Sequence, residues 1–175
     1  MKEFIFANLI LFFLPFGFAD AKESYPGKLR QEIYKTIAQP LTDQMECLTL
    51  ASTAYKVDEF ILLSVLLVEK GYLAPLKKNN NGSYDHGYGQ INTIRASEIA
   101  EIGLTLEDVK NDPCKNIIAT SHILKNEITE SGNVWEGIGN YHYDITGQWP
   151  KNHFTYRQTV FNEYLRIISI ATQHI

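Results

Sequence analysis

The chain has 175 residues, a length that allows one domain with a sizeable hydrophobic core. Its 16 Lys and Arg residues against 20 Asp and Glu residues give a net charge of −4, so nucleic acid is not an expected partner. The five histidines lack the spacing of metal ligands, so we expect no metal. We expect no other cofactor either.

The first 21 residues have the pattern of an export signal. Lys2 precedes an almost unbroken apolar run from Phe4 to Phe18, and Ala19-Asp20-Ala21 offers small residues to a signal peptidase. We predict a signal peptide over 1–21 and a mature domain over 22–175 in the periplasm. The apolar run is shorter than the ~20 residues of a membrane span, so no stable span is expected after cleavage. Cleavage after Ala19 and an uncleaved anchor are the alternatives.

The chain has two cysteines, Cys47 and Cys114. An even number of cysteines in an exported chain predicts one disulfide, and two buried free thiols are the alternative. Closing a loop of this length would contribute on the order of 4 kcal/mol in the chain-entropy model.

Apolar residues at helical spacing predict a mostly helical chain. Asp58 is the expected N-cap of a buried central helix that Gly71 is suited to end, and Asp112-Pro113 is a strong start signal for a later helix. The expected helices are 28–38, 42–55, 59–70, 93–102, 105–110, 113 to about 132, one that Asn133 caps, and 152–172.

Residues 71–92 lack helical periodicity and are rich in turn formers. Asn81-Gly82 favours a tight hairpin turn and at most a small β element. A calcium loop with Gly82 at its sixth position would take Lys77 and Tyr88 as its first and twelfth ligands, and these side chains exclude calcium. Long irregular loops in compact domains tend to be functional.

The central helix ends in Glu69, directly before this loop. A carboxyl at the end of an apolar helix is poorly solvated, which favours its neutral form and should raise its pKa. A general acid near neutral pH needs that state. Glu69 is therefore the candidate acid.

Two further segments are candidates to meet Glu69: the turn from Gly87 to Asn92 and the helix end Asn140-Tyr141-His142. Together they would supply amides and aromatic rings beside an acid. Sugars present hydroxyl groups at their edges and C–H faces that stack on aromatic rings, so this mixture suits a sugar polymer.

Three segments follow one another along the chain: Val68–Gly71, Asn81–Asn92 and Gly139–His142. In this order they resemble the signature of the soluble lytic transglycosylase (SLT) domain. A fourth segment, Asp112–Ile117, with the upstream Cys47, is similar to small members of that family that accompany secretion, conjugation and pilus machines, and the whole resemblance spans about residues 47–164.

The resemblance implies a mainly α, goose-type-lysozyme-like single domain with a small irregular or β region. It implies an enzyme that acts on the glycan strands of peptidoglycan and leaves 1,6-anhydromuramic acid ends. Glu69 would be the catalytic acid and base, and Tyr141 would orient its carboxyl group by a hydrogen bond. Gln90, Asn92 and His142 would line the glycan sites.

The resemblance also implies that Gly87 lets the backbone pass close to the sugar. Three departures from the family pattern stand near the site. Lys70 replaces a serine that contacts substrate, and its charge would favour the carboxylate of Glu69. Gly89 replaces a methionine and removes an apolar wall. The loop after Tyr141 is longer than usual and carries Tyr143, Asp144 and Trp149.

Two alternative functions remain open at this point. Asp85 as a second catalytic carboxylate would make the protein a hydrolytic muramidase, although bonding to nearby backbone amides in a turn is the preferred role for Asp85. Lys70 and Gly89 instead favour a glycan-binding assembly factor whose catalysis has decayed.

Overall fold

The computed structural model describes residues 27–37, 39–72, 76–144 and 146–173, and the predicted signal peptide lies outside them. The described part is mainly helical with one small sheet, as predicted. In chain order its elements are α1 Gly27–Ile37, η1 Gln39–Gln44, α2 Met45–Tyr55, α3 Glu59–Glu69, β1 Lys77–Lys78, β2 Tyr84–His86, β3 Ile91–Asn92, η2 Thr93–Arg95, α4 Ala96–Glu101, α5 Leu106–Asn111, α6 Pro113–Ser131, α7 Val134–His142 and α8 Pro150–Gln173.

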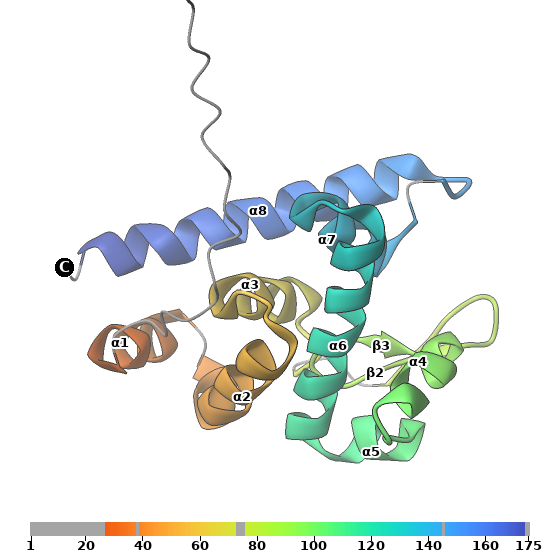
Figure 1. Ribbon diagram of the computed structural model, residues 1–175, viewed down its shortest axis with the longest axis horizontal. Coiled ribbons are helices and arrows are strands. Elements are labelled where there is room, and N and C mark those ends of the chain that lie inside the picture. The colour runs from red at the N-terminus through yellow and green to blue at the C-terminus, as the bar shows by residue number, and fades with distance from the viewer. Residues whose placement is uncertain (1–26, 38, 73–75, 145, 174–175) are drawn as a thin grey trace, which may run out of the picture.

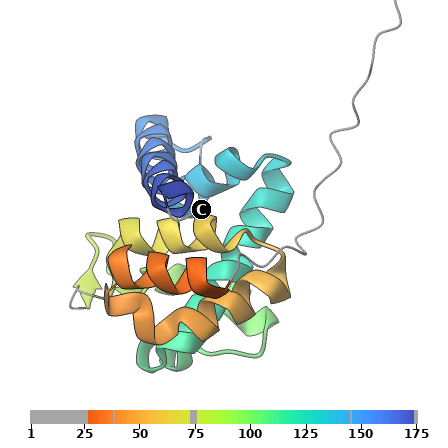
Figure 2. The ribbon, with the colours of Figure 1, turned by 90° about the vertical axis from the view of Figure 1, so that its left-hand side faces the viewer.

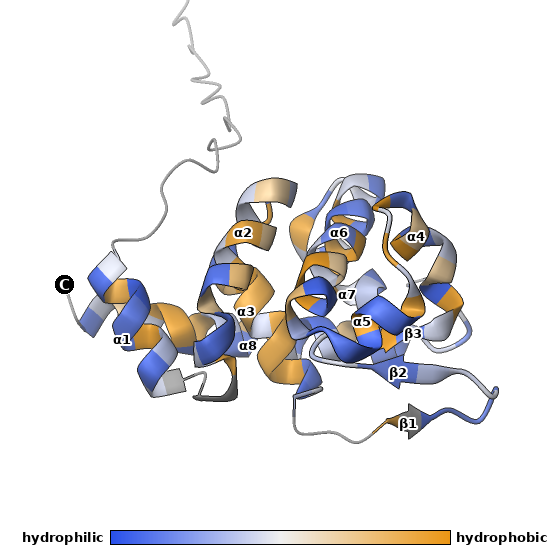
Figure 3. Ribbon diagram, turned by 90° about the horizontal axis from the view of Figure 1, so that it is seen from below, coloured by the Kyte–Doolittle hydropathy of each residue, from blue (hydrophilic) through white to orange (hydrophobic). Residues whose placement is uncertain are grey.

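Helix α3 is the centre of the core. Asp58 caps it by accepting hydrogen bonds from the backbone N–H groups of Phe60 and Ile61. Eight of its residues are buried, and α2 and α8 pack against it (Figure 1). Each fully buried Leu, Val or Phe side chain contributes roughly 1.5–3 kcal/mol, so this helix fixes the position of whatever follows it. Its apolar ribbon contrasts with strand β2 and the turn before it, which are hydrophilic (Figure 3).

Helix α1 lies against α3, with α2 beside it (Figure 2). The carboxylate of Glu59, at the start of α3, is buried and accepts hydrogen bonds from Arg30 at 3.0 Å and Tyr34 at 2.8 Å. Burial and the neighbouring Glu59 charge raise the pKa of Tyr34, so its hydroxyl remains a donor. This buried ion pair fixes how α1 docks.

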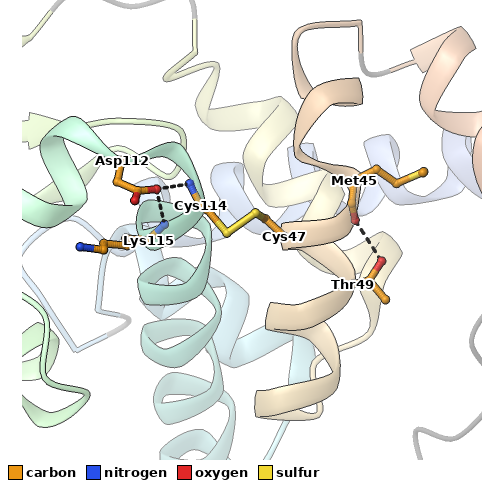
Figure 4. Close-up of a disulfide and its surroundings, with 6 residues drawn as sticks. All are labelled: Met45, Cys47, Thr49, Asp112, Cys114 and Lys115. Carbon is orange, nitrogen blue, oxygen red and sulfur yellow. Dashed lines mark hydrogen bonds between the residues drawn. A yellow bond between two sulfur atoms is a disulfide. The ribbon is translucent and has the colours of Figure 1, made fainter.

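Helix α6 runs in front of the sheet in the view of Figure 1 and is joined to α2 by the predicted disulfide (Figures 1 and 4). The Cα atoms of Cys47 and Cys114 are 5.4 Å apart. Asp112 accepts from the backbone N–H groups of Cys114 and Lys115, and Pro113 occupies the first turn, as the sequence predicted. The disulfide therefore joins the first turn of α6 to the first turn of α2.

The small sheet is antiparallel and has the order β1-β2-β3. Lys78 pairs with Tyr84 and Asp85 with Asn92. Gly82, in the connecting turn, has a φ of 84°, which confirms the turn predicted at Asn81-Gly82. The sheet therefore carries Asp85 and Asn92 side by side.

Several boundary predictions were wrong, and two of them concern α2 and α3. Residues 42–44 belong to the 3-10 helix η1, so α2 begins at Met45. The left-handed residue that ends α3 is Lys70, with a φ of 54°, and its N–H bonds to the carbonyl of Leu66. Gly71 is required for a different reason, described below.

Within the described ranges, no helix combines the length and apolar character that crossing a membrane requires. The same residues contain no group of three His, Cys, Asp or Glu side chains that could hold a metal ion.

Replacing Cys47 and Cys114 together with serine should lower the free energy of unfolding by about 4 kcal/mol, because the denatured chain gains the entropy of an open loop. Urea denaturation followed by circular dichroism measures this. Wild-type protein under a reducing agent is the matched control and should unfold at the same urea concentration as the variant. Equal midpoints for oxidised wild type and the variant would contradict a stabilising disulfide.

Candidate active site

Glu69 is half-buried at the last position of α3 and lines a cleft of about 540 Å³. The cleft lies between the small sheet and the end of α7. Its lining is mostly polar: Glu69, Asn79, Asn81, Ser83, Asp85, Gln90, Ile91, Asn92, Ile94, Arg95, Tyr141, His142 and Tyr143. Four predicted site residues, Gln90, Asn92, Tyr141 and His142, therefore meet Glu69 at one cleft.

A close approach of two backbone segments brings the 87–92 turn to Glu69. A Cβ atom added to Gly71 would lie 1.8 Å from the carbonyl oxygen of Gly87 and 2.8 Å from that of Tyr88. Only glycine allows this packing. The segment after the acid and the turn that faces the acid are thus pressed together.

Asn116, fully buried on α6, holds the same turn from behind. Its side-chain oxygen accepts from the N–H of Gly89 at 2.8 Å, and its Nδ2 donates to the carbonyls of His86 at 3.0 Å and Val109 at 2.8 Å. One side chain therefore satisfies three buried backbone groups that would otherwise lose their hydrogen bonds.

Gly87 has a φ of 62°, and a Cβ atom there would lie 2.3 Å from Nδ2 of Asn116. Its required close contact is with α6, on the side of the turn away from the cleft lining. A contact of Gly87 with a sugar stays a prediction.

Gly89 fits a specific neighbour. A Cβ atom at Gly89 would lie 1.9 Å from Oγ1 of Thr120 and 2.9 Å from the hydroxyl of Tyr141. The space that a larger residue would need is filled by Thr120, so the glycine matches its surroundings. The next residue, Gln90, has a φ of 48°, and its side-chain amide donates to the carbonyl of Gly87 at 3.0 Å. The turn therefore holds Gln90 in a conformation that non-glycine residues rarely adopt.

The tyrosine that hydrogen-bonds Glu69 is Tyr156, on α8. Its hydroxyl donates to Oε1 of Glu69 at 2.6 Å. The hydroxyl of Tyr141 donates instead to the carbonyl of Gly89 at 2.7 Å, so the predicted hydrogen bond from Tyr141 to Glu69 is wrong. Tyr141 holds the turn, and Tyr156 orients the acid.

Both tyrosines stay protonated well above neutral pH. Burial raises the pKa of Tyr141, and the nearby Glu69 charge raises it further. Burial, the Glu69 charge and Tyr141 raise the pKa of Tyr156 in the same way. The ring of His142 stacks on Tyr156, with centroids 4.5 Å apart and planes 7° from parallel. Tyr156 is therefore held as a donor.

Sequence reasoning missed Tyr156 and Asn116. Tyr156 stands four residues before Val160 and shares its buried face of α8, and this spacing was the available signal. Asn116 stands in the Asp112–Ile117 segment, but only the fold shows that its amide reaches the 86–89 backbone.

Asp85 also lines the cleft, on β2. Its Oδ1 accepts from the side-chain amide of Asn92 at 2.6 Å and its Oδ2 from that of Asn79 at 3.0 Å. Both oxygens act as acceptors, as in an ionised carboxylate. The partners are side-chain amides on the sheet and its turn, whereas the sequence had suggested backbone amides in a turn.

Lys70 lies outside this cleft. Its side chain is exposed and lines a separate hollow with Asn162, Glu163 and Arg166 of α8. The loop after Tyr141 contributes Tyr143 to the cleft, whereas Trp149 is 61% exposed on the outer part of that loop. Its backbone N–H donates to the hydroxyl of Tyr143.

The helical fold, the small sheet and an acid at the end of the central helix define a lysozyme-like domain. The family described as "Transglycosylase SLT domain" matches residues 46–157, which is more than half of the chain. The chain belongs to this family.

Curated relatives match over most of their lengths. Protein IpgF of Shigella flexneri is 26% identical over 136 residues, covering 77% of this chain and 90% of the relative. A protein of Escherichia coli O157:H7 named "Peptidoglycan-binding-like protein" is 25% identical, covering 69% and 77%. Invasion protein IagB of Salmonella typhimurium (strain SL1344) is 20% identical, covering 73% and 81%.

Replacing Asn116 with alanine should lower the free energy of unfolding by about 3 kcal/mol or more, because each buried polar group left without a partner costs roughly 1–3 kcal/mol. Urea denaturation measures the loss. Asn126→Ala, at a half-buried position of the same helix where the amide hydrogen-bonds the His122 ring, is the matched control and should cost about 1 kcal/mol or less. Equal losses in the two variants would show that Asn116 does not hold the turn.

Proposed function

We propose that this protein is a peptidoglycan lytic transglycosylase. It cleaves the β-1,4 bond between N-acetylmuramic acid and N-acetylglucosamine without water and leaves a 1,6-anhydromuramic acid end. The observation that carries the proposal is the hydrogen bond from Tyr156 to a half-buried Glu69 in a polar cleft. Membership of the SLT family supports it.

The reaction needs one acid that becomes one base. The carboxyl group of Glu69 gives its proton to the glycosidic oxygen as the bond from that oxygen to the anomeric carbon breaks. The resulting carboxylate takes the proton of the muramoyl 6-hydroxyl as the 6-oxygen bonds to the anomeric carbon. Glu69 ends in its starting state, so one carboxyl group suffices where most glycosidases need two.

The other cleft residues act on the substrate or on the acid. Tyr156 donates to the same carboxyl oxygen through both steps and keeps the group aimed at the cleft. Gln90, Asn92 and His142 contact the sugars. The substrate's own N-acetyl group steadies the positive charge at the anomeric carbon.

The place of action is the periplasm, after export directed by residues 1–21. The disulfide between Cys47 and Cys114 supports an oxidising compartment. One relative is named an invasion protein, which supports local opening of the wall for a trans-envelope apparatus such as a secretion, conjugation or pilus machine.

A hydrolytic muramidase is the second candidate, and Asp85 favours it. Asp85 shares the cleft with Glu69, and two asparagine amides hold both of its carboxylate oxygens. A fixed second carboxylate is what a retaining glycosidase uses to form or stabilise its intermediate. In that mechanism water enters and the product has a reducing end.

A glycan-binding factor without catalysis is the least supported reading. Two residues had suggested it. Lys70 lies outside the cleft, and Thr120 fills the space that a side chain at position 89 would need, so neither residue now argues against catalysis.

Glu69→Gln should lower the rate of anhydromuropeptide release from purified sacculi by about 10² to 10⁴, the usual contribution of a general acid and base. Mass spectrometry of the soluble products measures it. Glu130→Gln, an exposed change on α6, should leave the rate unchanged. Anhydro products released at the wild-type rate by Glu69→Gln would refute Glu69 as the acid, and no release by wild type would favour the binding factor.

Asp85→Asn separates the two enzymatic mechanisms. In a transglycosylase the anhydro product continues to form. The rate falls only slightly, because the change disturbs no more than the hydrogen bonds from Asn79 and Asn92 to residue 85. In a muramidase the reaction falls by orders of magnitude, because the second carboxylate is gone. Digestion in H₂¹⁸O gives the independent readout. Reducing ends that carry ¹⁸O from the wild-type enzyme would contradict the transglycosylase.

A further inference from the structure

A second hollow adjoins the cleft on the side of α8. It has a volume of about 420 Å³ and shares His142 with the cleft. Tyr156 forms part of its wall, so the residue that hydrogen-bonds Glu69 borders both the acid and this hollow. Anything bound in the hollow therefore lies one side chain from the acid.

The lining of the second hollow differs from that of the cleft. It offers the exposed ammonium of Lys151, the amide of Asn152 and the hydroxyls of Thr155 and Thr159 along α8, with the side chain of Val68 opposite. These groups are hydrogen-bond partners for peptide groups and carboxylates, beside one apolar contact.

The second hollow continues into a third. Val68 and Thr159 line both, and the third hollow, of about 410 Å³, adds Lys70. Its other charged groups, Arg166 and Glu163, form an ion pair with each other. The two hollows together form a track that leads from the cleft along α3 and α8.

Two lysines of the track form no ion pair with a described residue. Among the described residues, no carboxylate oxygen lies within 4.0 Å of the ammonium of Lys151 or of Lys70. Arg157, on the same helix, is by contrast paired with Glu136. The positive charges of Lys151 and Lys70 make the track electrostatically complementary to an anionic ligand.

We propose that this track binds the peptide stem of the muramoyl residue at the cleavage site, with Lys151 and Lys70 pairing its carboxylates. The inference rests on the proposed function. The glycan backbone is neutral, whereas the stem attached to the muramoyl lactyl group carries free carboxylates and peptide groups. The stem is therefore the part of the substrate that matches the track.

Binding to the Glu69→Gln variant tests this without turnover. The two probes are glycan strands with tetrapeptide stems and the same strands after an amidase has hydrolysed the stems off and left only the lactyl carboxylate on each muramoyl residue, both measured by titration calorimetry. We expect the probe with stems to bind more tightly than the probe without them. Combining Lys151→Gln with Glu69→Gln should lower the affinity for the probe with stems by roughly two- to fivefold, which is the contribution of an exposed ion pair. Lys70→Gln should act in the same direction.

The matched control is Lys28→Gln on α1, which makes the same charge change at the far end of the molecule (Figure 1). It should leave both affinities unchanged. The stem-dependent gain should shrink as salt is added, because salt screens exposed charges.

Three outcomes would overturn the inference. Equal binding of both probes to Glu69→Gln would show that the stem is not recognised, while leaving the proposed function intact. A loss of affinity in Lys151→Gln that is the same for both probes would make the hollow a glycan site. Binding of neither probe would reject the stem site and the proposed function together.

Discussion

The site depends on the contact between the backbone at Gly71 and the backbone at Gly87. This contact leaves no room for a side chain at position 71. Because α3 is buried on nearly all sides, Gly71 is fixed as soon as the helix has docked. The 87–92 turn is then positioned by packing against it and by the amide of Asn116 from α6. A carboxyl group and the turn that faces it are thus placed by the core, which is more exact than placement by a mobile loop.

Two tyrosines from different helices complete this arrangement and divide the work between them. Tyr141 donates to the carbonyl of Gly89 and fixes the turn, whereas Tyr156 donates to Glu69 and fixes the acid. Each hydroxyl has one proton to donate, so one tyrosine could not do both. The stacking of His142 on Tyr156 joins the end of α7 to α8 at this point. The acid is therefore oriented by the last helix of the chain.

The sequence predicted the helices and their caps better than the long-range contacts between them. Asp58, Asp112 and Asn133 cap their helices as expected, because a cap depends only on residues within one turn. The tyrosine that reaches Glu69 is 87 residues away, and helical spacing assigns Tyr156 to a buried face without naming its partner. The same limit applies to Asn116, whose three acceptors and donors lie in other elements. Long-range partners require the fold.

The backbone conformation at Lys70 determines which part of the molecule its side chain faces. Next to an acid in the sequence, a lysine suggests an ion pair that would hold the acid charged. Residue 70, however, ends α3 in the left-handed conformation, with a φ of 54°. That turn separates the two side chains: Glu69 lines the cleft, and Lys70 lines a hollow beside α8. The lysine's charge is thus directed at the track along α8, where a carboxylate of the substrate can use it.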